Sequence, residues 1–217
     1  MHFLCKKAVM DLLLLAGEHR KNEFLSIVPS PGCKIQWLDN LPVDDKTLRA
    51  DLVIDLLFDN SPGRVERLQQ PAFDCVMVNW LQGGLPGNLV AINGWPGFMG
   101  RTLIEASCGN EGVRQHAEVL AAQAGRTIEW ITEASGFISP AIVGGIINEA
   151  FLALEEGTGT EEAIDTAMKL GTNYPFGPFQ WARQIGYRNV VDYLEYNNRH
   201  TPGYQVSILL KEKALAQ

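Results

Sequence analysis

Basic residues are scarce in this chain of 217 residues, which carries 18 Lys and Arg against 25 Asp and Glu and a formal net charge of −7. Nucleic-acid surfaces need clustered cations, so this charge balance argues against a nucleic-acid partner. The apolar run at residues 12–15 is too short to cross a bilayer, and no small-residue cleavage site marks a signal peptide. The sequence therefore predicts a cytoplasmic protein without a membrane segment.

Paired cysteines and metal-ligand spacings are also missing. The four cysteines, Cys5, Cys33, Cys75 and Cys108, are scattered without a CxxC pair. Buried free thiols in a reducing compartment are the ordinary interpretation of such a pattern. The four histidines neither pair at helical spacing nor lie beside cysteines, so the sequence predicts no metal site.

The first 134 residues alternate short apolar runs with amphipathic stretches, a pattern typical of a parallel sheet covered by helices. The expected strands are 11–17, 33–39, 50–58, 75–79, 90–93, 102–107 and 126–132, and the expected helices are 18–27 and 112–124. The sequence thus predicts an α/β Rossmann-like domain at residues 1–134, followed by an all-α domain at residues 135–217. The boundary is expected at residues 133–135.

The second domain carries helix signals throughout. Ser139 is expected to cap the first helix, with Pro140 at its first position and Ile142 opening an apolar face with a spacing of four residues. Thr160 is expected to open the next helix and Gly171 to close it. Two more helices are expected at 190–196 and 204–216. Most of the dense aromatic residues are expected in the core: Tyr174, Phe176, Phe179, Trp181, Tyr187, Tyr193, Tyr196 and Tyr204.

A single glycine, Gly17, ends the first expected strand, where a dinucleotide-binding fingerprint has three glycines. Glu18 places a carboxylate beside the expected diphosphate, and His19 and Asn22 bring side chains where glycines are usual. Asp39, 22 residues after Gly17, stands where a ribose-binding acid belongs, but it is equally an ordinary aspartate at a strand end. We therefore expect NAD to bind weakly or not at all.

Two cations follow that glycine in the expected helix. Arg20 and Lys21 could offset the negative charge beside the turn, or they could simply face water. The residue pattern leaves both interpretations open.

Residues 136–157 read GFISPAIVGGIINEAFLALEEG, and residues 160–186 read TEEAIDTAMKLGTNYPFGPFQWARQIG. These segments resemble the opening of the helical C-terminal domain of 3-hydroxyacyl-CoA dehydrogenases. The family motifs GFVVNR, NEA, LLEEG and YPMGPFELAD occur there at the same spacing. The resemblance implies NAD-dependent oxidation of a 3-hydroxyacyl-CoA in fatty-acid metabolism. It also implies a C-terminal domain that dimerises and walls the acyl pocket. Because the aromatic and apolar faces exceed what so small a domain needs for its own core, we expect a homodimer built through these helices.

The same resemblance places the catalytic positions. Residues 93–105, NGWPGFMGRTLIE, match the family segment HFFNPVPLMPLVE without a gap. Glu105 then matches the family glutamate, and Asn93 takes the position of the histidine that accepts the proton of the 3-hydroxyl group. An amide has no usable basicity near neutral pH, whereas imidazole does. Pro140 takes the position of the asparagine in GFVVNR.

The resemblance also reaches other positions of the first domain. Residues 53–60 resemble VIEAVFEN, which makes Asp59 a candidate for the cofactor side. Residues 77–81 stand where ASNTS is usual, so Asn79 is kept while Leu81 replaces a serine that touches substrate in the family. Only ten residues separate Asp39 from Ala50, where the family carries a long helical excursion associated with CoA.

Two functions stay open at this point. One is an NAD-dependent 3-hydroxyacyl-CoA dehydrogenase, for example one acting on 3-hydroxybutyryl-CoA. The other is a protein of the same fold without full redox activity, which binds an acyl-CoA-like small molecule or serves as a partner subunit. The combined loss of the glycines, the histidine, the asparagine and the serine favours the second.

Overall fold

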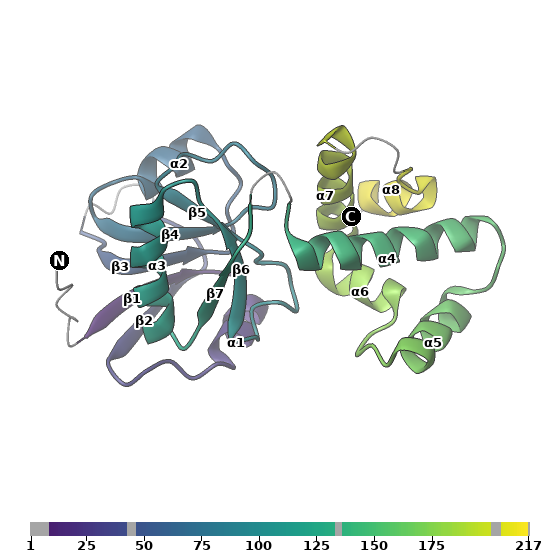
Figure 1. Ribbon diagram of the computed structural model, residues 1–217, viewed down its shortest axis with the longest axis horizontal. Helices are drawn as coiled ribbons and strands as arrows, with labels where there is room; N and C mark the ends of the chain where they lie inside the picture. Colours follow the sequence, from purple (N-terminus) through teal and green to yellow (C-terminus); the bar gives the residue numbers. More distant parts are fainter. Residues whose placement is uncertain (1–8, 43–46, 133–135, 201–204, 217) are drawn as a thin grey trace. The chain divides into compact units, whose positions relative to one another are not determined.

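The chain forms two compact units in a computed structural model that describes residues 9–42, 47–132, 136–200 and 205–216. One unit comprises Met1–Gly94 and Phe98–Ala134, and the other comprises Trp95–Gly97 and Ser135–Gln217. The first is an α/β unit and the second is helical, so the predicted fold class is confirmed (Figure 1). The predicted boundary at residues 133–135 lies outside the described residues.

The α/β unit is built on a seven-stranded sheet in the order β2-β1-β3-β4-β5-β6-β7. Its strands are β1 (Met10–Leu15), β2 (Cys33–Leu38), β3 (Ala50–Asp55), β4 (Phe73–Asn79), β5 (Leu89–Ile92), β6 (Leu103–Ser107) and β7 (Thr127–Trp130). Neighbouring strands run parallel except for β5 and β6. The chain lays β2 on one side of β1 and β3 on the other. The carboxyl ends of β1 and β3 therefore form a topological switch point, where open α/β sheets bind their ligands.

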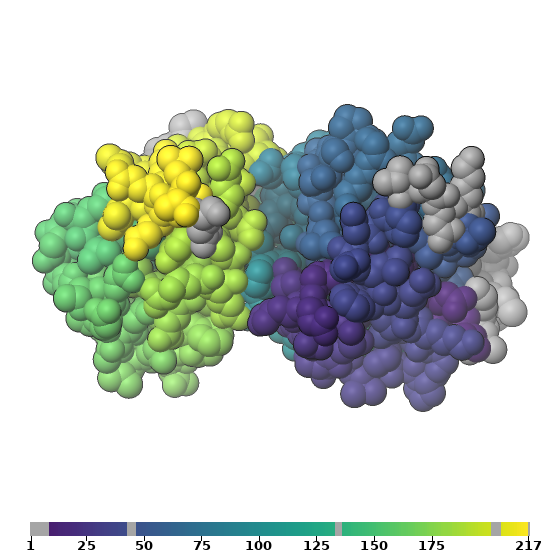
Figure 2. Space-filling model, turned by 180° about the vertical axis from the view of Figure 1, so that it is seen from behind, coloured from purple at the N-terminus to yellow at the C-terminus, as the bar shows by residue number. Residues whose placement is uncertain are grey.

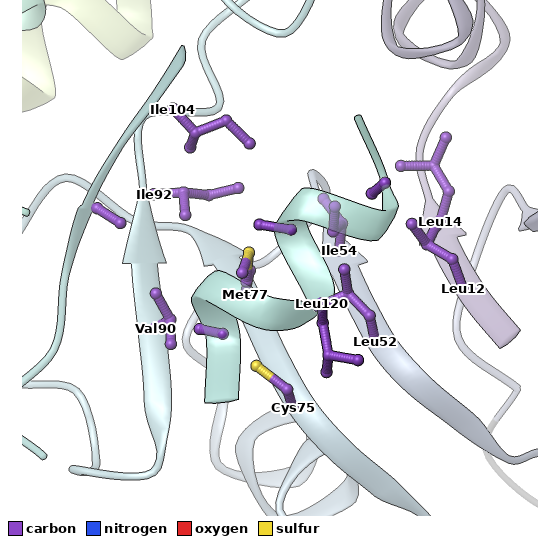
Figure 3. Packing of buried hydrophobic residues seen from close by; sticks show 14 of the residues in the cluster. Leu12, Leu14, Leu52, Ile54, Cys75, Met77, Val90, Ile92, Ile104 and Leu120 are labelled. Carbon is purple, nitrogen blue, oxygen red and sulfur yellow. The ribbon is translucent and has the colours of Figure 1, made fainter. Parts of the chain in front are cut away.

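Helices cover both faces of this sheet. α1 (Glu18–Leu25) and α3 (Glu111–Gln123) pack on one face, where Phe24 and Leu120 join the buried strand residues. Figure 3 shows Leu120 lying among side chains of β3 and β4. α2 (Pro62–Leu68) covers the other face together with Leu41 and Leu48 from the connection between β2 and β3. Burial of these apolar side chains is the main force that holds the layers together.

Two features of this unit differ from the expectation. β3 ends at Asp55 rather than at residue 58, because the Asp55 side chain accepts a hydrogen bond from the Leu57 N–H (2.9 Å) and turns the chain. α2 was not expected. Its signal was the pair Ser61 and Pro62, since serine is favoured at a helix N-cap and proline at the first helical position.

The cysteines of the described residues are free thiols. Cys75 and Cys108 are buried and Cys33 is half-buried, while Cys5 lies outside the described residues. Burial raises the pKa of the Cys75 thiol to about 12, which keeps it protonated at neutral pH. The expectation of buried free thiols is confirmed for Cys75 and Cys108.

The helical unit consists of α4 (Ile138–Glu155), α5 (Glu161–Thr172), α6 (Pro178–Ile185), α7 (Tyr187–His200) and α8 (Ile208–Leu215). α8 lies on the surface in the space-filling view, at the yellow end of the chain (Figure 2). Phe179, Trp181 and Tyr193 are buried as expected, whereas Phe176 is 39% exposed. The predicted core position Tyr204 lies outside the described residues. The Tyr193 hydroxyl donates to the Phe137 carbonyl (2.9 Å), and its ring meets Trp95 edge-on.

α6 was not expected, and helix ends and faces also differ in detail from the expectation. Phe137, not Ser139, is the N-cap of α4. The buried face of α4 carries Val143, Ile147 and Phe151, while Ile142 is 55% exposed. Both faces of this helix are apolar, so periodicity alone could not choose between them.

The second helix of this unit begins as expected and ends later. The Thr160 hydroxyl caps α5 by accepting a hydrogen bond from the Ala163 N–H (3.2 Å). The helix runs through Gly171 and stops at Asn173, whose left-handed φ of 57° ends it. Asparagine is among the few residues besides glycine that adopt this conformation readily.

One described helix, α4, is long and apolar enough by length and composition to cross a membrane, and 39% of it is buried in the structure. A core helix passes the same test. Its length and composition therefore assign no membrane role.

Candidate functional site

Pairing between β5 and β6 brings the two matched catalytic positions together. The antiparallel register sets Ala91 opposite Ser107 and Ile92 opposite Ala106. It continues to Asn93, whose backbone N–H donates to the Glu105 carbonyl (3.1 Å). Residues opposite one another on antiparallel strands carry their side chains on the same face of the sheet, close enough to interact. The spacing of 12 residues in the sequence thus becomes a neighbouring pair, and Asn93 is only 4% exposed.

Asn79, at the end of β4, supports the turn that follows Asn93. Its side-chain oxygen accepts a hydrogen bond from the Gly94 N–H (3.0 Å). A Cβ on residue 94 would lie 2.7 Å from the Asn79 Cβ, so only glycine fits there. Leu81 is buried (8% exposed) and offers no hydroxyl group. Asn79 is thus placed beside the Asn93 turn, whereas Leu81 belongs to the apolar packing.

The turn after β1 is open at its glycine. Gly17 is the N-cap of α1, and a Cβ built there would meet nothing within 4 Å. Glu18 and His19 are exposed, and the Glu18 side chain keeps 73% of its surface in water. A carboxylate in the first turn of a helix is stabilised by the N-terminal end of the helix dipole. Glu18 therefore supplies negative charge where a phosphate would seek positive potential, and the Lys21 ammonium, 3.9 Å from the Glu18 Oε1 atom, offsets part of that charge.

Neither cation of α1 is simply solvated. The Lys21 ammonium lies 3.9 Å from the centre of the Trp37 ring. A cation in this position is attracted to the face of the aromatic ring. The Trp37 indole N–H donates to the Ala16 carbonyl (2.6 Å), which ties β2 to this turn. Arg20 donates to the Gly94 carbonyl instead of reaching toward the turn.

The two acids proposed for the cofactor side lie at exposed chain turns. Asp39 follows the last residue of β2 and is exposed. Asp59 accepts a hydrogen bond from the Ser61 N–H (3.0 Å), and hydrogen bonding from Ser61 lowers the pKa of Asp59. The Asp59 carboxylate therefore organises the chain that enters α2.

An ion pair that the sequence reasoning missed lies at the end of β3. Asp55 is fully buried and accepts hydrogen bonds from the Arg64 Nε (2.7 Å) and Nη2 (2.8 Å). Burial raises the pKa of Asp55, and the Arg64 guanidinium opposes that shift. The signal was an acid at the end of a buried strand, since a buried charge needs a partner. That partner came from α2, which was not expected.

A cleft of about 390 Å³ lies between α2 and residues 40–42. This volume is within the range of small-molecule pockets. Its lining includes the polar residues Asn40, Arg64 and Gln70 and the apolar residues Leu41 and Pro42. Residues 40–42 follow β2, and Arg64 lies in the helix that follows β3.

Two residues of the matched motifs in the helical unit, Pro140 and Asn148, are buried. Pro140 is buried at the third position of α4, where it offers neither an amide side chain nor a backbone donor. Asn148 is fully buried; its amide donates to the Gln205 carbonyl (2.8 Å) and accepts from the Ser207 N–H (2.9 Å). Asn148 thereby joins α4 to the start of α8. These hydrogen bonds account for Asn148 without a catalytic role.

Comparison with known proteins agrees with this description. Residues 136–217 match the model of the 3-hydroxyacyl-CoA dehydrogenase C-terminal domain. The chain is 36% identical over 119 residues to 3-hydroxyadipyl-CoA dehydrogenase of Escherichia coli (strain K12), which is 54% of this chain and 25% of that protein. It is 38% identical over 76 residues to a probable 3-hydroxybutyryl-CoA dehydrogenase of Bacillus subtilis (strain 168), or 35% of this chain and 26% of that protein. The aligned part thus spans about a quarter of these relatives.

A solved structure extends the likeness in fold to nearly the whole chain. The (S)-3-hydroxybutyryl-CoA dehydrogenase from Ralstonia eutropha superposes with a TM-score of 0.70 over 96% of this chain and 94% of that chain, at 18% identity. At that identity the likeness speaks for the fold alone. Together with the sequence relatives, the matched segment leads to one conclusion: residues 136–217 belong to the 3-hydroxyacyl-CoA dehydrogenase family, in a chain that shares the fold of these enzymes.

Proposed function

We propose that this chain is a 3-hydroxyacyl-CoA dehydrogenase-like protein that lacks full redox activity and acts as an acyl-ligand-binding or partner subunit. The observation that carries the proposal is Asn93, which stands opposite Glu105 at the position matched to the family histidine. A carboxamide cannot accept the proton of a 3-hydroxyl group at neutral pH. Loss of general base catalysis lowers the reaction rate by about 10²–10⁴-fold.

The turn after β1 supports weak or absent NAD binding. A tightly held dinucleotide needs backbone N–H groups at a glycine-rich turn, with glycines at three positions. Only Gly17 remains here, and the Glu18 carboxylate competes with a diphosphate for the N-terminal end of α1. The residues present therefore do not fit a tightly bound dinucleotide.

An active NAD-dependent 3-hydroxyacyl-CoA dehydrogenase is the second candidate. Two observations favour it: the space above Gly17 is open, and Glu105 is retained opposite position 93. Calorimetric titration with NADH separates the two candidates most directly. The proposal predicts binding weaker than micromolar, and a dissociation constant in the micromolar range would contradict it.

Activity gives a second, independent test. The purified protein should not oxidise 3-hydroxybutyryl-CoA with NAD above background, and Asn93→His alone should not restore the reaction. A base contributes only when cofactor and substrate are held in reacting geometry, and Leu81 and Pro140 also replace family residues. Wild-type turnover in the usual enzyme range of ~1–10³ s⁻¹ would refute the inactive reading. Strong recovery of activity in Asn93→His would contradict the proposal that the turn after β1 no longer binds NAD.

We also propose that the chain forms a homodimer through its C-terminal helices. Apolar side chains remain exposed on three helices of this unit: Ile138 (54%) and Ile142 (55%) on α4, Leu170 (82%) on α5, and Ile208 (62%) and Leu215 (79%) on α8. Covering such side chains with a second copy would remove apolar surface from water.

A further inference from the structure

In the loop between β5 and β6 (residues 93–102), Gly94, Met99 and Gly100 are bound by side chains of α1. The Glu23 Oε1 atom accepts hydrogen bonds from the backbone N–H groups of Met99 (2.7 Å) and Gly100 (3.3 Å). The approach at Gly100 is close, since a Cβ there would lie 3.4 Å from the Ser26 Oγ. One carboxylate on α1 thus binds two backbone donors of the loop.

Arg20 holds that carboxylate in place and binds the loop at its other stem. Its Nε donates to the Glu23 Oε2 (3.1 Å), and its Nη2 donates to the Gly94 carbonyl. The side chains are only 14% and 13% exposed, respectively, so water competes little for these bonds. Burial lowers the pKa of Arg20, although Glu23 opposes that shift.

Arg126, which precedes β7, binds the same loop from a third direction. Its Nη1 donates to the carbonyl groups of Met99 (2.6 Å) and Arg101, and its Nη2 donates to the Phe24 carbonyl (2.8 Å) in the last turn of α1. The guanidinium also lies over the Phe24 ring (4.2 Å) and is 2% exposed. Arg126 therefore satisfies helix-end and loop carbonyls at once.

These contacts form one connected network. Glu23 lies between a guanidinium and two loop amides, and Met99 is bound at both its N–H and its carbonyl group. Removing one partner leaves another charged or polar group buried without its bond, which is costly. The bonds are therefore expected to form and break together rather than one at a time.

We propose that Arg20, Glu23 and Arg126 form a latch that fixes the β5–β6 loop on α1 and opens as a single unit. The latched loop joins Asn93 to Glu105, so the latch controls the order of the segment between the two matched catalytic positions. It also gives α1 a role other than phosphate binding. The proposal goes beyond the proposed function and holds whether or not the chain oxidises a substrate.

Hydrogen exchange of the Met99 and Gly100 amides tests the latch in the full chain. Arg20→Met should speed exchange of both amides by about tenfold or more, as expected for residues coupled in one network, although Arg20 touches neither amide. Glu23→Gln should act in the same direction. The matched control is Lys21→Met, which removes the neighbouring cation of α1 and should leave both amides protected. The β4 amides should stay protected in every variant.

Unchanged exchange at Met99 and Gly100 in Arg20→Met, with acceleration only in Glu23→Gln, would show independent hydrogen bonds and overturn the latch. Equal acceleration in Lys21→Met, or acceleration that extends through β4, would indicate general loosening and also overturn it. Arg20→Lys keeps the charge but loses the fork of donors, so it should accelerate exchange less than Arg20→Met. This milder variant decides the question if Arg20→Met fails to fold.

Discussion

At the residue scale, Asp165 and Gly177 give a structural role to part of the segment 160–186, which resembles the family motif. The Asp165 Oδ1 atom accepts a hydrogen bond from the Phe179 N–H (2.8 Å) at the first turn of α6. A Cβ on residue 177 would lie within 2.5 Å of the Asp165 Cβ. The acid satisfies a helix N–H group that has no partner within α6, and the glycine makes room for the acid. This pair therefore encodes a junction between α5 and α6.

Gly177→Ala tests that junction. The added methyl group cannot fit without moving Asp165, so we expect a loss of about 1–3 kcal/mol in the free energy of unfolding, as for overpacked cores. The measurement is urea unfolding followed by circular dichroism. Gly171→Ala is the matched control, because a Cβ there meets nothing within 4 Å in an exposed part of α5. It should stabilise the protein by about 0.4–1 kcal/mol. Equal effects of the two changes would contradict the packing argument.

At the element scale, α8 is attached to α4 by polar contacts as well as by apolar packing. The Ser207 hydroxyl donates to Glu155 and accepts from the Leu210 N–H (3.1 Å), which makes Ser207 the N-cap of α8. Glu155 also accepts from the Leu209 N–H (2.7 Å). A carboxylate at this helix start satisfies donors that α8 itself leaves unpaired. The attachment of α8 thus depends on the charge state of Glu155.

We predict that this attachment weakens in acid. The hydrogen bonds from Ser207 and then Leu209 lower the pKa of Glu155 in the folded chain. Its contribution is therefore complete above the pKa that it has in the unfolded chain, and it is lost as the pH falls through the lower folded-state pKa. Unfolding free energies of the wild type and Glu155→Gln should differ near neutral pH and converge as the pH falls below about 4. A difference that stays constant with pH would contradict this assignment.

At the scale of the whole molecule, the sheet order places the matched positions at strand ends. Gly17 follows β1, Asn79 ends β4 and Asn93 follows β5, and these strands are all parallel. The carboxyl ends of parallel strands meet at one edge of the sheet. The positions matched by resemblance therefore lie at one edge of the sheet.

Assembly belongs to the same scale and has its own test. Ile142→Glu puts a charge on the exposed apolar side of α4, so it should convert the proposed homodimer into a monomer. Light scattering at micromolar concentration gives the mass of each form. Glu149→Gln, at an exposed polar position of the same helix, is the control and should leave the dimer intact. A wild-type monomer at that concentration would disprove the homodimer.

Local pattern was sufficient for most of the secondary structure. Alternating apolar runs predicted the strands within a few residues, and the predicted signal Thr160 lies at a true helix start, whereas the signal at Ser61 was missed. Local pattern could not predict which face of a helix is buried where both faces are apolar, as on α4. Only packing against the other helices decided that Val143 is buried while Ile142 is exposed.

The sequence by itself predicted the two-part organisation and the likeness to 3-hydroxyacyl-CoA dehydrogenases, because these depend on residue order and periodicity. The tertiary structure decided which groups meet. Asn93 pairs with Glu105 across two strands, Asp55 finds Arg64 on α2, and Arg20 reaches Gly94 over a separation of 74 residues. The physical reason is that a buried charge takes whichever partner the folded chain brings within hydrogen-bond distance, and spacing in the sequence does not reveal that partner.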